Sequence, residues 1–419
     1  MKSYSNSAAK LPFKELIKRV GPSMILTGIV IGPGAITTAA MIGATYGYSL
    51  LWLFIPIGFM GITFVMTTYR ISILTRKPLL EAIRYYYGSM AAKIVGTALF
   101  IACTFFTIGN ISGTGMGMSL IFNLDWKLGA IIMIGLLMIV YFSKGVYSKV
   151  EKIATICVVG MIIAFYITLV GAGGPSWTEL GSGVIHWSFP IGSLATAVAF
   201  VSTNASVTTG IYGTYLGKEK KWRTEDLFNG VMLTDSISHM IGVILISGAI
   251  ILVGAIVLNP AGIEINSPTE LAEMLVPSLG KAARYIMGIA LLGAGFSSLL
   301  GNTQRAVVLL NAGYEKPTSL DSKNIKFGAV VVIVLSAIVA FAYGGSPTQL
   351  ILIANICTAI ATPIAGFFLC LMIRRKDINK GYPIPKFLQF SMYISYVFVV
   401  IISVPILIQT AYNLVQNFF

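Results

Sequence analysis

Long apolar segments follow one another along almost the whole chain. Eleven can be counted, and each except the short fourth is near or above the ~20 residues that a helix needs to cross a bilayer. They cover residues 21–47, 50–74, 92–121, 128–143, 153–171, 190–216, 228–258, 283–311, 327–344, 349–373 and 387–414. This pattern predicts an all-α integral membrane protein with eleven transmembrane helices.

The first and the sixth of these segments are interrupted near their middles. Gly32-Pro33-Gly34 interrupts the first, and the stretch from Phe200 to Gly210 interrupts the sixth. Proline removes a backbone hydrogen-bond donor and glycine disfavours a helix, so each segment is predicted to form two half-helices joined by an extended link. Unpaired backbone at that depth is tolerated only where protein or a water-filled cavity surrounds it.

The two interruptions also share a local pattern. Residues 35–39 read Ala-Ile-Thr-Thr-Ala, and residues 206–210 read Ser-Val-Thr-Thr-Gly. Matched interruptions in two halves of a chain indicate an inverted-repeat secondary transporter, in which the substrate lies at the midplane between the broken helices. The alternative is a pair of glycine-kinked helices that bind no ligand.

The composition agrees with a membrane protein. The chain of 419 residues is 56% hydrophobic and 11% charged, whereas roughly 25% of the residues of a soluble protein are charged. The net charge of +14 does not indicate a nucleic-acid partner, because the basic residues form short clusters between the apolar segments. The four cysteines lie within apolar segments and lack metal-ligand spacing, so we expect no disulfide and no metal cluster.

The basic clusters alternate between successive loops. Lys and Arg residues precede the first segment and follow the second, fourth, sixth, eighth and tenth, whereas the other loops contain only Lys127, Lys281 and Arg284. The positive-inside rule therefore places the N-terminus in the cytoplasm and the C-terminus outside the cell membrane. The first repeat (21–171) and the second repeat (190–373) then have opposite orientations, and residues 387–414 form one additional helix.

Several stretches resemble the Nramp family of divalent-metal transporters, and together they cover nearly the whole chain. They are Val20-Gly21-Pro22-Ser23, Gly32-Pro33-Gly34, residues 43–52, residues 70–84, Gly113-Thr114, Asp235, residues 295–298 and residues 362–365. The resemblance implies the leucine-transporter fold, a five-plus-five inverted repeat with interrupted helices one and six. It also implies metal uptake coupled to protons.

The metal ligands of that family do not carry over to this chain. Gly32 and Ala35 stand where the family motif has aspartate and asparagine, and residues 202–204 (Ser-Thr-Asn) stand where it has Met-Pro-His. Ala361 aligns with a glutamine, while Thr107 and Asn110 align with acids of the proton path. A bare divalent ion would lack a compensating carboxylate, and uncompensated charge at low dielectric costs several kcal/mol.

This loss leads us to expect an anion as the substrate. Hydroxyl groups and two half-helix N-termini favour negative charge, and bicarbonate is the leading candidate. The expected substrate-binding residues are Gly32, Pro33, Gly34, Ala35, Thr37, Thr38, Ser202, Thr203, Asn204, Ser206 and Thr208. The alternative is a divalent cation (Mg²⁺, Mn²⁺ or Fe²⁺), as in the resembling family, and hydrated Mg²⁺ would fit better than Mn²⁺ because it keeps its waters.

Import of an anion needs a driving ion, and Na⁺ is the candidate. Ser297 and Ser298 match the hydroxyl pair that joins first-helix carbonyls around Na⁺ in sodium-coupled members of the wider fold, and Gly28 to Ile31 would supply those carbonyls. The alternative is a packing face of small residues. We expect no other cofactor and no enzyme, because the sequence shows neither a nucleotide loop nor a nucleophile with a base. The sequence leaves the oligomeric state open.

Charged residues within the apolar segments complete the expectations. Arg305 lies near the end of the eighth segment, where snorkelling to the interface is expected, with attraction of an anion as the alternative. Asp235 is expected to pair with Arg70 or nearby lysines, and His239 is expected to be structural.

Overall fold

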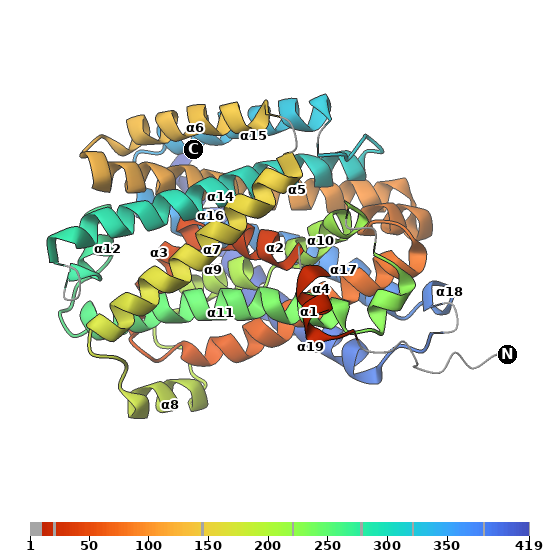
Figure 1. Cartoon of the computed structure of the whole chain (residues 1–419), viewed down its shortest axis with the longest axis horizontal. Helices are drawn as coiled ribbons and strands as arrows, with labels where there is room; N and C mark the ends of the chain where they lie inside the picture. The colour runs from red at the N-terminus through yellow and green to blue at the C-terminus, as the bar shows by residue number, and fades with distance from the viewer. Residues whose placement is uncertain are drawn as a thin grey trace.

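The computed structural model describes residues 11–19, 22–143, 146–219, 222–276, 280–320, 322–379 and 382–418. All regular elements within these ranges are helical, and the long helices lie side by side as one bundle (Figure 1). Some of the predicted loop and motif residues lie outside the described residues, among them Lys10, Val20, Gly21, Lys144, Lys220, Lys221 and Lys380.

The helices of the first repeat correspond to the first five apolar segments. They are α1 (Phe13–Arg19), α2 (Pro22–Val30), α3 (Pro33–Tyr46), η1 (Leu51–Leu53), α4 (Phe54–Thr75), α5 (Leu79–Phe122), α6 (Trp126–Tyr141) and α7 (Val146–Gly171). α5 begins earlier than the sequence predicted and changes direction at Gly88, where φ is 88°.

The remaining helices follow the other six segments and their loops. They are α8 (Trp177–Ile185), α9 (Leu194–Asn204), α10 (Val207–Glu219), η2 (Thr224–Leu227), α11 (Val231–Val257), α12 (Pro268–Glu273), η3 (Gly280–Ala282), α14 (Ala283–Gly313), α15 (Lys323–Ala342), α16 (Pro347–Thr358), α17 (Ala361–Ile373), α18 (Lys376–Asn379) and α19 (Lys386–Phe418).

Eight stretches of the described residues are long and apolar enough to span a membrane. α6 is apolar but shorter, and the first predicted segment begins with Gly21, which lies outside the described ranges. The all-helical membrane architecture is therefore confirmed, while the count of eleven spans remains a prediction.

Both predicted interruptions are present. The first segment forms α2 and α3 with Ile31 and Gly32 between them, and the sixth forms α9 and α10 with Ala205 and Ser206 between them. A third interruption was not predicted and separates α16 from α17 at residues 359–360. Pro363 explains it, because a proline cannot donate to the carbonyl four residues earlier and its ring clashes with that group.

The break between α2 and α3 is held against the paired helices α5 and α14. A Cβ atom on Gly113 of α5 would lie 2.0 Å from Cβ of Pro33, and one on Gly295 of α14 would lie 3.1 Å from Cγ of the same ring. Only glycine allows the two helices to approach the proline this closely. The scaffold therefore fixes where the first helix is interrupted.

Candidate functional site

The interruption of the first helix is an extended turn. Gly32 has φ −98° and ψ 179°, and Pro33 occupies the first turn of α3. Proline suits this position because its missing N–H would have no partner inside the helix. Gly32 N donates to the carbonyl oxygen of Val30 (2.9 Å), and Ile36 N donates to that of Gly32 (3.1 Å).

The space beside Gly32 is filled by neutral polar side chains. A Cβ atom there would lie 2.4 Å from Oδ1 of Asn110 and 2.5 Å from Oγ of Ser298. Asn110 Nδ2 donates to Ser298 Oγ (2.7 Å), so the two side chains form one unit. The aspartate expected at position 32 from the family motif would have no room in this arrangement.

The predicted coupling-ion residues meet at the end of α2. Ser297 Oγ donates to the carbonyl oxygen of Gly28 (3.3 Å), and Ser298 Oγ donates to that of Ile29 (2.7 Å). Asn302 Nδ2 also donates to the carbonyl oxygen of Ile29 (3.1 Å). The two serines therefore contact the carbonyls of Gly28 and Ile29, which both lie within the predicted range of Gly28 to Ile31.

The interrupted first, sixth and tenth helices are joined by a second group of polar residues. Ser202 Oγ donates to the carbonyl oxygen of Asn355 (2.9 Å), and Thr358 Oγ1 donates to Ser202 Oγ (3.2 Å). Asn355 Nδ2 donates to the carbonyl oxygen of Gly34 (3.0 Å) and to Thr38 Oγ1 (2.8 Å). We call the oxygen atoms of these five buried residues the acceptor cluster.

Asn355 and Thr358 are not among the substrate-binding residues expected from the sequence. Their signal was a polar pair within an apolar helix, just before the interruption that Pro363 causes. Polar side chains in a membrane helix are costly unless they face a partner or a cavity. Like the hydroxyl residues of the first and sixth helices, this polar pair could have indicated a position that faces a partner or a cavity.

The other predicted site residues are engaged within the protein or free. Thr203 Oγ1 donates to the carbonyl oxygen of Ala199 (2.9 Å), and Asn204 Oδ1 accepts from Ser247 of α11 (3.2 Å). Ser206 Oγ accepts from Thr208 N (3.2 Å) and so caps the start of α10. The hydroxyl groups of Thr37 and Thr208 are buried without a partner among the described residues, and Ala35 is buried in α3.

The start of α2 is closed by acid and histidine side chains of α11. Ser23 N donates to Asp235 Oδ1 (3.1 Å), and Tyr69 of α4 donates to Asp235 Oδ2 (2.9 Å). Thr27 Oγ1 lies 2.9 Å from Nδ1 of His239. We call these contacts the α2 gate.

The structure changes two expectations about charged residues. Arg70 donates to Asn379 Oδ1 (3.2 Å) and to the carbonyl oxygen of Tyr382 (2.8 Å), so these bonds go to neutral acceptors in place of the Asp235 carboxylate. The expected pairing of Asp235 with nearby lysines stays a prediction. Arg305 does not snorkel, since it is only 4% exposed. Its guanidinium donates to Asn302 Oδ1 and lies 5.9 Å from the ring centre of Phe106. Helix packing holds it in the interior.

The site has no charged ligand set. Among the described residues, no group of three or more His, Cys, Asp or Glu side chains is arranged to hold a metal ion. The donors and acceptors near the two breaks are hydroxyls, amides and backbone carbonyls. An ion bound there would meet neutral oxygen atoms.

A family model and individual relatives place the chain in the same family. The family model described as "Natural resistance-associated macrophage protein-like" matches residues 23–409. The divalent metal cation transporter MntH of Agrobacterium fabrum is 24% identical over 379 residues, which cover 87% of this chain and 81% of that protein. The protein of the same name from Clostridium acetobutylicum is 23% identical over 405 residues, with coverages of 95% and 92%.

Solved structures share the fold. A manganese transporter from Eremococcus coleocola superposes with a TM-score of 0.76 at 12% identity, covering 96% of this chain and 89% of that chain. A nucleobase-cation-symport-1 family transporter, in a closed conformation with bromovinylhydantoin bound, superposes with a TM-score of 0.59 at 12% identity, covering 94% and 93%. The expected transporter fold is thereby confirmed.

These comparisons overturn the expected anion substrate. The relatives are named divalent metal cation transporters, so the prediction of bicarbonate is wrong. The geometry supplies a physical reason. The hydroxyls of Ser202 and Thr203 donate their single proton to backbone carbonyls. A hydroxyl used in this way presents only lone pairs, which suit a cation and not an anion.

Proposed function

Because the chain belongs to the Nramp family, we propose that it carries a divalent metal cation across the membrane as a secondary transporter. The observation that carries this proposal is the family match over residues 23–409, with relatives that are named for divalent metal transport. Nramp proteins are transporters and not enzymes, and this chain contains the membrane-spanning helices that such a role requires.

The acceptor cluster is the proposed contact surface for the ion. Its carbonyl and hydroxyl oxygens are hard donors, and hard donors suit Mg²⁺ better than the softer transition metals. Among the described residues the cluster's hydrogen bonds join hydroxyls, one amide and backbone carbonyls, so a fully dehydrated dication would be poorly compensated. An ion that keeps most of its water shell avoids this cost, and Mg²⁺ gives up water reluctantly. We therefore propose hydrated Mg²⁺ as the preferred cargo.

Access to the cluster is proposed to alternate at its two ends. The α2 gate closes one end through Asp235 and His239. At the other end α3 packs tightly on α11, since a Cβ atom on Gly43 would lie 2.2 Å from the carbonyl oxygen of Ile251. Transport requires these two closures to open in turn, with the broken helices moving against the scaffold of α5 and α14.

Uptake of Mg²⁺ and Mn²⁺ into proteoliposomes tests the proposal. We expect uptake above that of protein-free liposomes, with Mg²⁺ preferred. Thr358→Val removes one hydroxyl of the acceptor cluster and should weaken the apparent affinity for Mg²⁺ about tenfold, since a lost hydrogen-bond partner in a buried site costs roughly 1–3 kcal/mol.

The matched control is Thr63→Val in α4, whose hydroxyl bonds only within its own helix, to the carbonyl oxygen of Phe59 (2.7 Å). This variant should transport normally. A preference for Mn²⁺ would overturn the choice of Mg²⁺ and keep divalent transport. No uptake of Mg²⁺, Mn²⁺ or Fe²⁺ would overturn the proposed function itself.

A further inference from the structure

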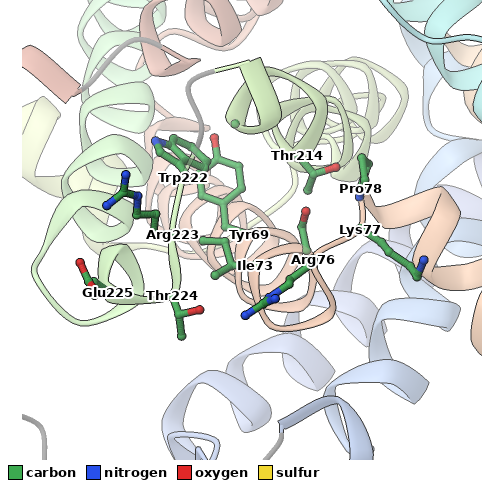
Figure 2. A pocket seen from close by; sticks show the side chains of 12 residues that line it. Tyr69, Ile73, Arg76, Lys77, Pro78, Thr214, Trp222, Arg223, Thr224 and Glu225 are labelled. Atoms are coloured by element: carbon green, nitrogen blue, oxygen red, sulfur yellow. The ribbon is translucent and has the colours of Figure 1, made fainter.

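A cavity lies apart from the acceptor cluster, where α4 ends and α5 begins. It has a volume of about 470 Å³ and is lined by the end of α4, the residues that join it to α5, the end of α10 and the loop before η2. Figure 2 shows Arg76, Lys77 and Arg223 around it, with Trp222 and Tyr69 together at one side. We call this cavity the basic pocket.

The charge of the basic pocket is unbalanced. Three cations line it, Arg76, Lys77 and Arg223, against one carboxylate, Glu225. The side chains of Arg76 and Arg223 are exposed and form no ion pair with any described residue. Guanidinium groups that line one cavity without a carboxylate partner can bind phosphate, because their N–H groups match its oxygens.

The backbone around the pocket is arranged to present these groups. Arg76 ends α4 in the left-handed conformation, with φ 55°, a position that glycine usually takes. Leu79 N at the start of α5 donates to Thr214 Oγ1 of α10 (3.1 Å), which fastens the two helices together beneath the pocket. The size suits a small organic phosphate, since ligand pockets commonly hold about 300–1,000 Å³.

The wall of the pocket is continuous with the α2 gate. Trp222 packs edge to face on Tyr69, with ring centroids 4.6 Å apart. Tyr69 in turn donates to Asp235, which accepts from Ser23 N at the start of α2. On the other side, a Cβ atom on Gly217 of α10 would lie 2.4 Å from the Trp222 ring. The pocket thus contacts one half of the sixth helix and, through Asp235, one half of the first.

We propose that the basic pocket binds a phosphate-bearing anion and that its occupancy stabilises the closed α2 gate. The ligand is a phosphate ester, which is available either from solution or as the headgroup of an anionic lipid. A bound phosphate would hold Arg76 of α4 and Arg223 of the loop together. It would thereby immobilise Trp222 against Tyr69 and keep Tyr69 on Asp235. This site is independent of which ion the protein carries.

Binding is tested with the full chain in phosphatidylcholine nanodiscs. One arm titrates glycerol 3-phosphate by calorimetry, and a second replaces part of the lipid by phosphatidylglycerol and counts bound lipids by native mass spectrometry. The double variant R76Q/R223Q should weaken binding by at least about tenfold, because it removes charge-assisted hydrogen bonds. The double variant K316Q/K323Q is the matched control, since both lysines are exposed and lie outside the pocket. It should bind as the unmodified protein does.

The two arms separate the sources of the ligand. Binding of glycerol 3-phosphate that R76Q/R223Q loses supports a soluble phosphate ester, and selective retention of phosphatidylglycerol that the same variant loses supports a lipid headgroup. Binding in neither arm overturns the proposal. Equal loss in both double variants also overturns it, because that result indicates general charge attraction.

Coupling to the gate has a separate readout. Bound ligand should slow amide hydrogen exchange several-fold in residues 23–30 of α2. Asp235→Ala lies outside the pocket lining and removes the carboxylate that accepts from Tyr69 and from Ser23 N, so this variant should bind the ligand normally while losing this slowing. If the ligand binds and exchange in α2 does not change, the link to the gate is wrong.

Discussion

At the scale of single residues, the site is defined by what replaces the charges of the family motif. Gly32 leaves room for Asn110 and Ser298, which bond to each other where an acid side chain would have pointed. The glycine at position 32 and the asparagine at position 110 therefore depend on each other, because an aspartate at position 32 would occupy the space that Asn110 fills. The space beside Gly32 is therefore neutral by packing as well as by composition.

The first prediction concerns the space at Gly32. Gly32→Ala places a Cβ atom within 2.5 Å of two side-chain oxygens and should destabilise the protein by about 1–3 kcal/mol, the usual cost of overpacking. Thermal unfolding of the purified protein should show a lower midpoint. The control is Gly135→Ala in α6, where nothing lies within 4 Å of the added atom. An unchanged midpoint for Gly32→Ala would show that the asparagine can move aside.

At the scale of elements, the end of α2 combines carbonyl and hydroxyl oxygens. Ser297 and Ser298 of α14 lie against the carbonyls of Gly28 and Ile29. Carbonyls at the end of an unwound half-helix suit a small cation, so coupling to Na⁺ at this place remains our prediction. A packing face of small residues would explain the same contacts without an ion.

Replacement of Na⁺ by choline tests this element. Uptake of the cargo should fall in choline, and Ser298→Ala should show the same low uptake in either salt. Ser391→Ala, in α19 outside the two repeats, is the control and should keep the full response. Equal uptake in Na⁺ and choline would reject the ion site and leave the packing role.

Much of the element arrangement could be predicted from the sequence, because glycine and proline act locally. Gly32-Pro33-Gly34 breaks its helix in any surroundings, and the structure confirms that break. The break after α16 was missed, since Pro363 stands within an apolar run without glycine beside it. The site residues expected near the breaks stay a prediction, and the direction of each O–H bond was not predictable. Ser202 donates to Asn355, a partner 153 residues away, which only the fold brings close.

At the scale of the whole molecule, the basic residues in the loops predict on which side of the membrane each terminus lies. The basic residues around Arg76, Arg223 and Arg375 belong to loops on the side that the positive-inside rule assigns to the cytoplasm. We expect the N-terminus on that side and the C-terminus of α19 outside. Reporter fusions test this, because alkaline phosphatase should be active after residue 419 and inactive before residue 1. The opposite pattern would invert the whole arrangement.

The unpredicted break in the tenth helix divides that helix between two neighbours. Asn355 of α16 donates to the carbonyl oxygen of Gly34 and to the hydroxyl of Thr38, so hydrogen bonds join α16 to α3. α17 is instead tied to α19, whose Tyr396 donates to the carbonyl oxygen of Pro363 (3.1 Å). A shift of α3 would then move α16 with it while α17 stays with α19. Residues 359–360 connect the two halves, so their backbone would have to change conformation.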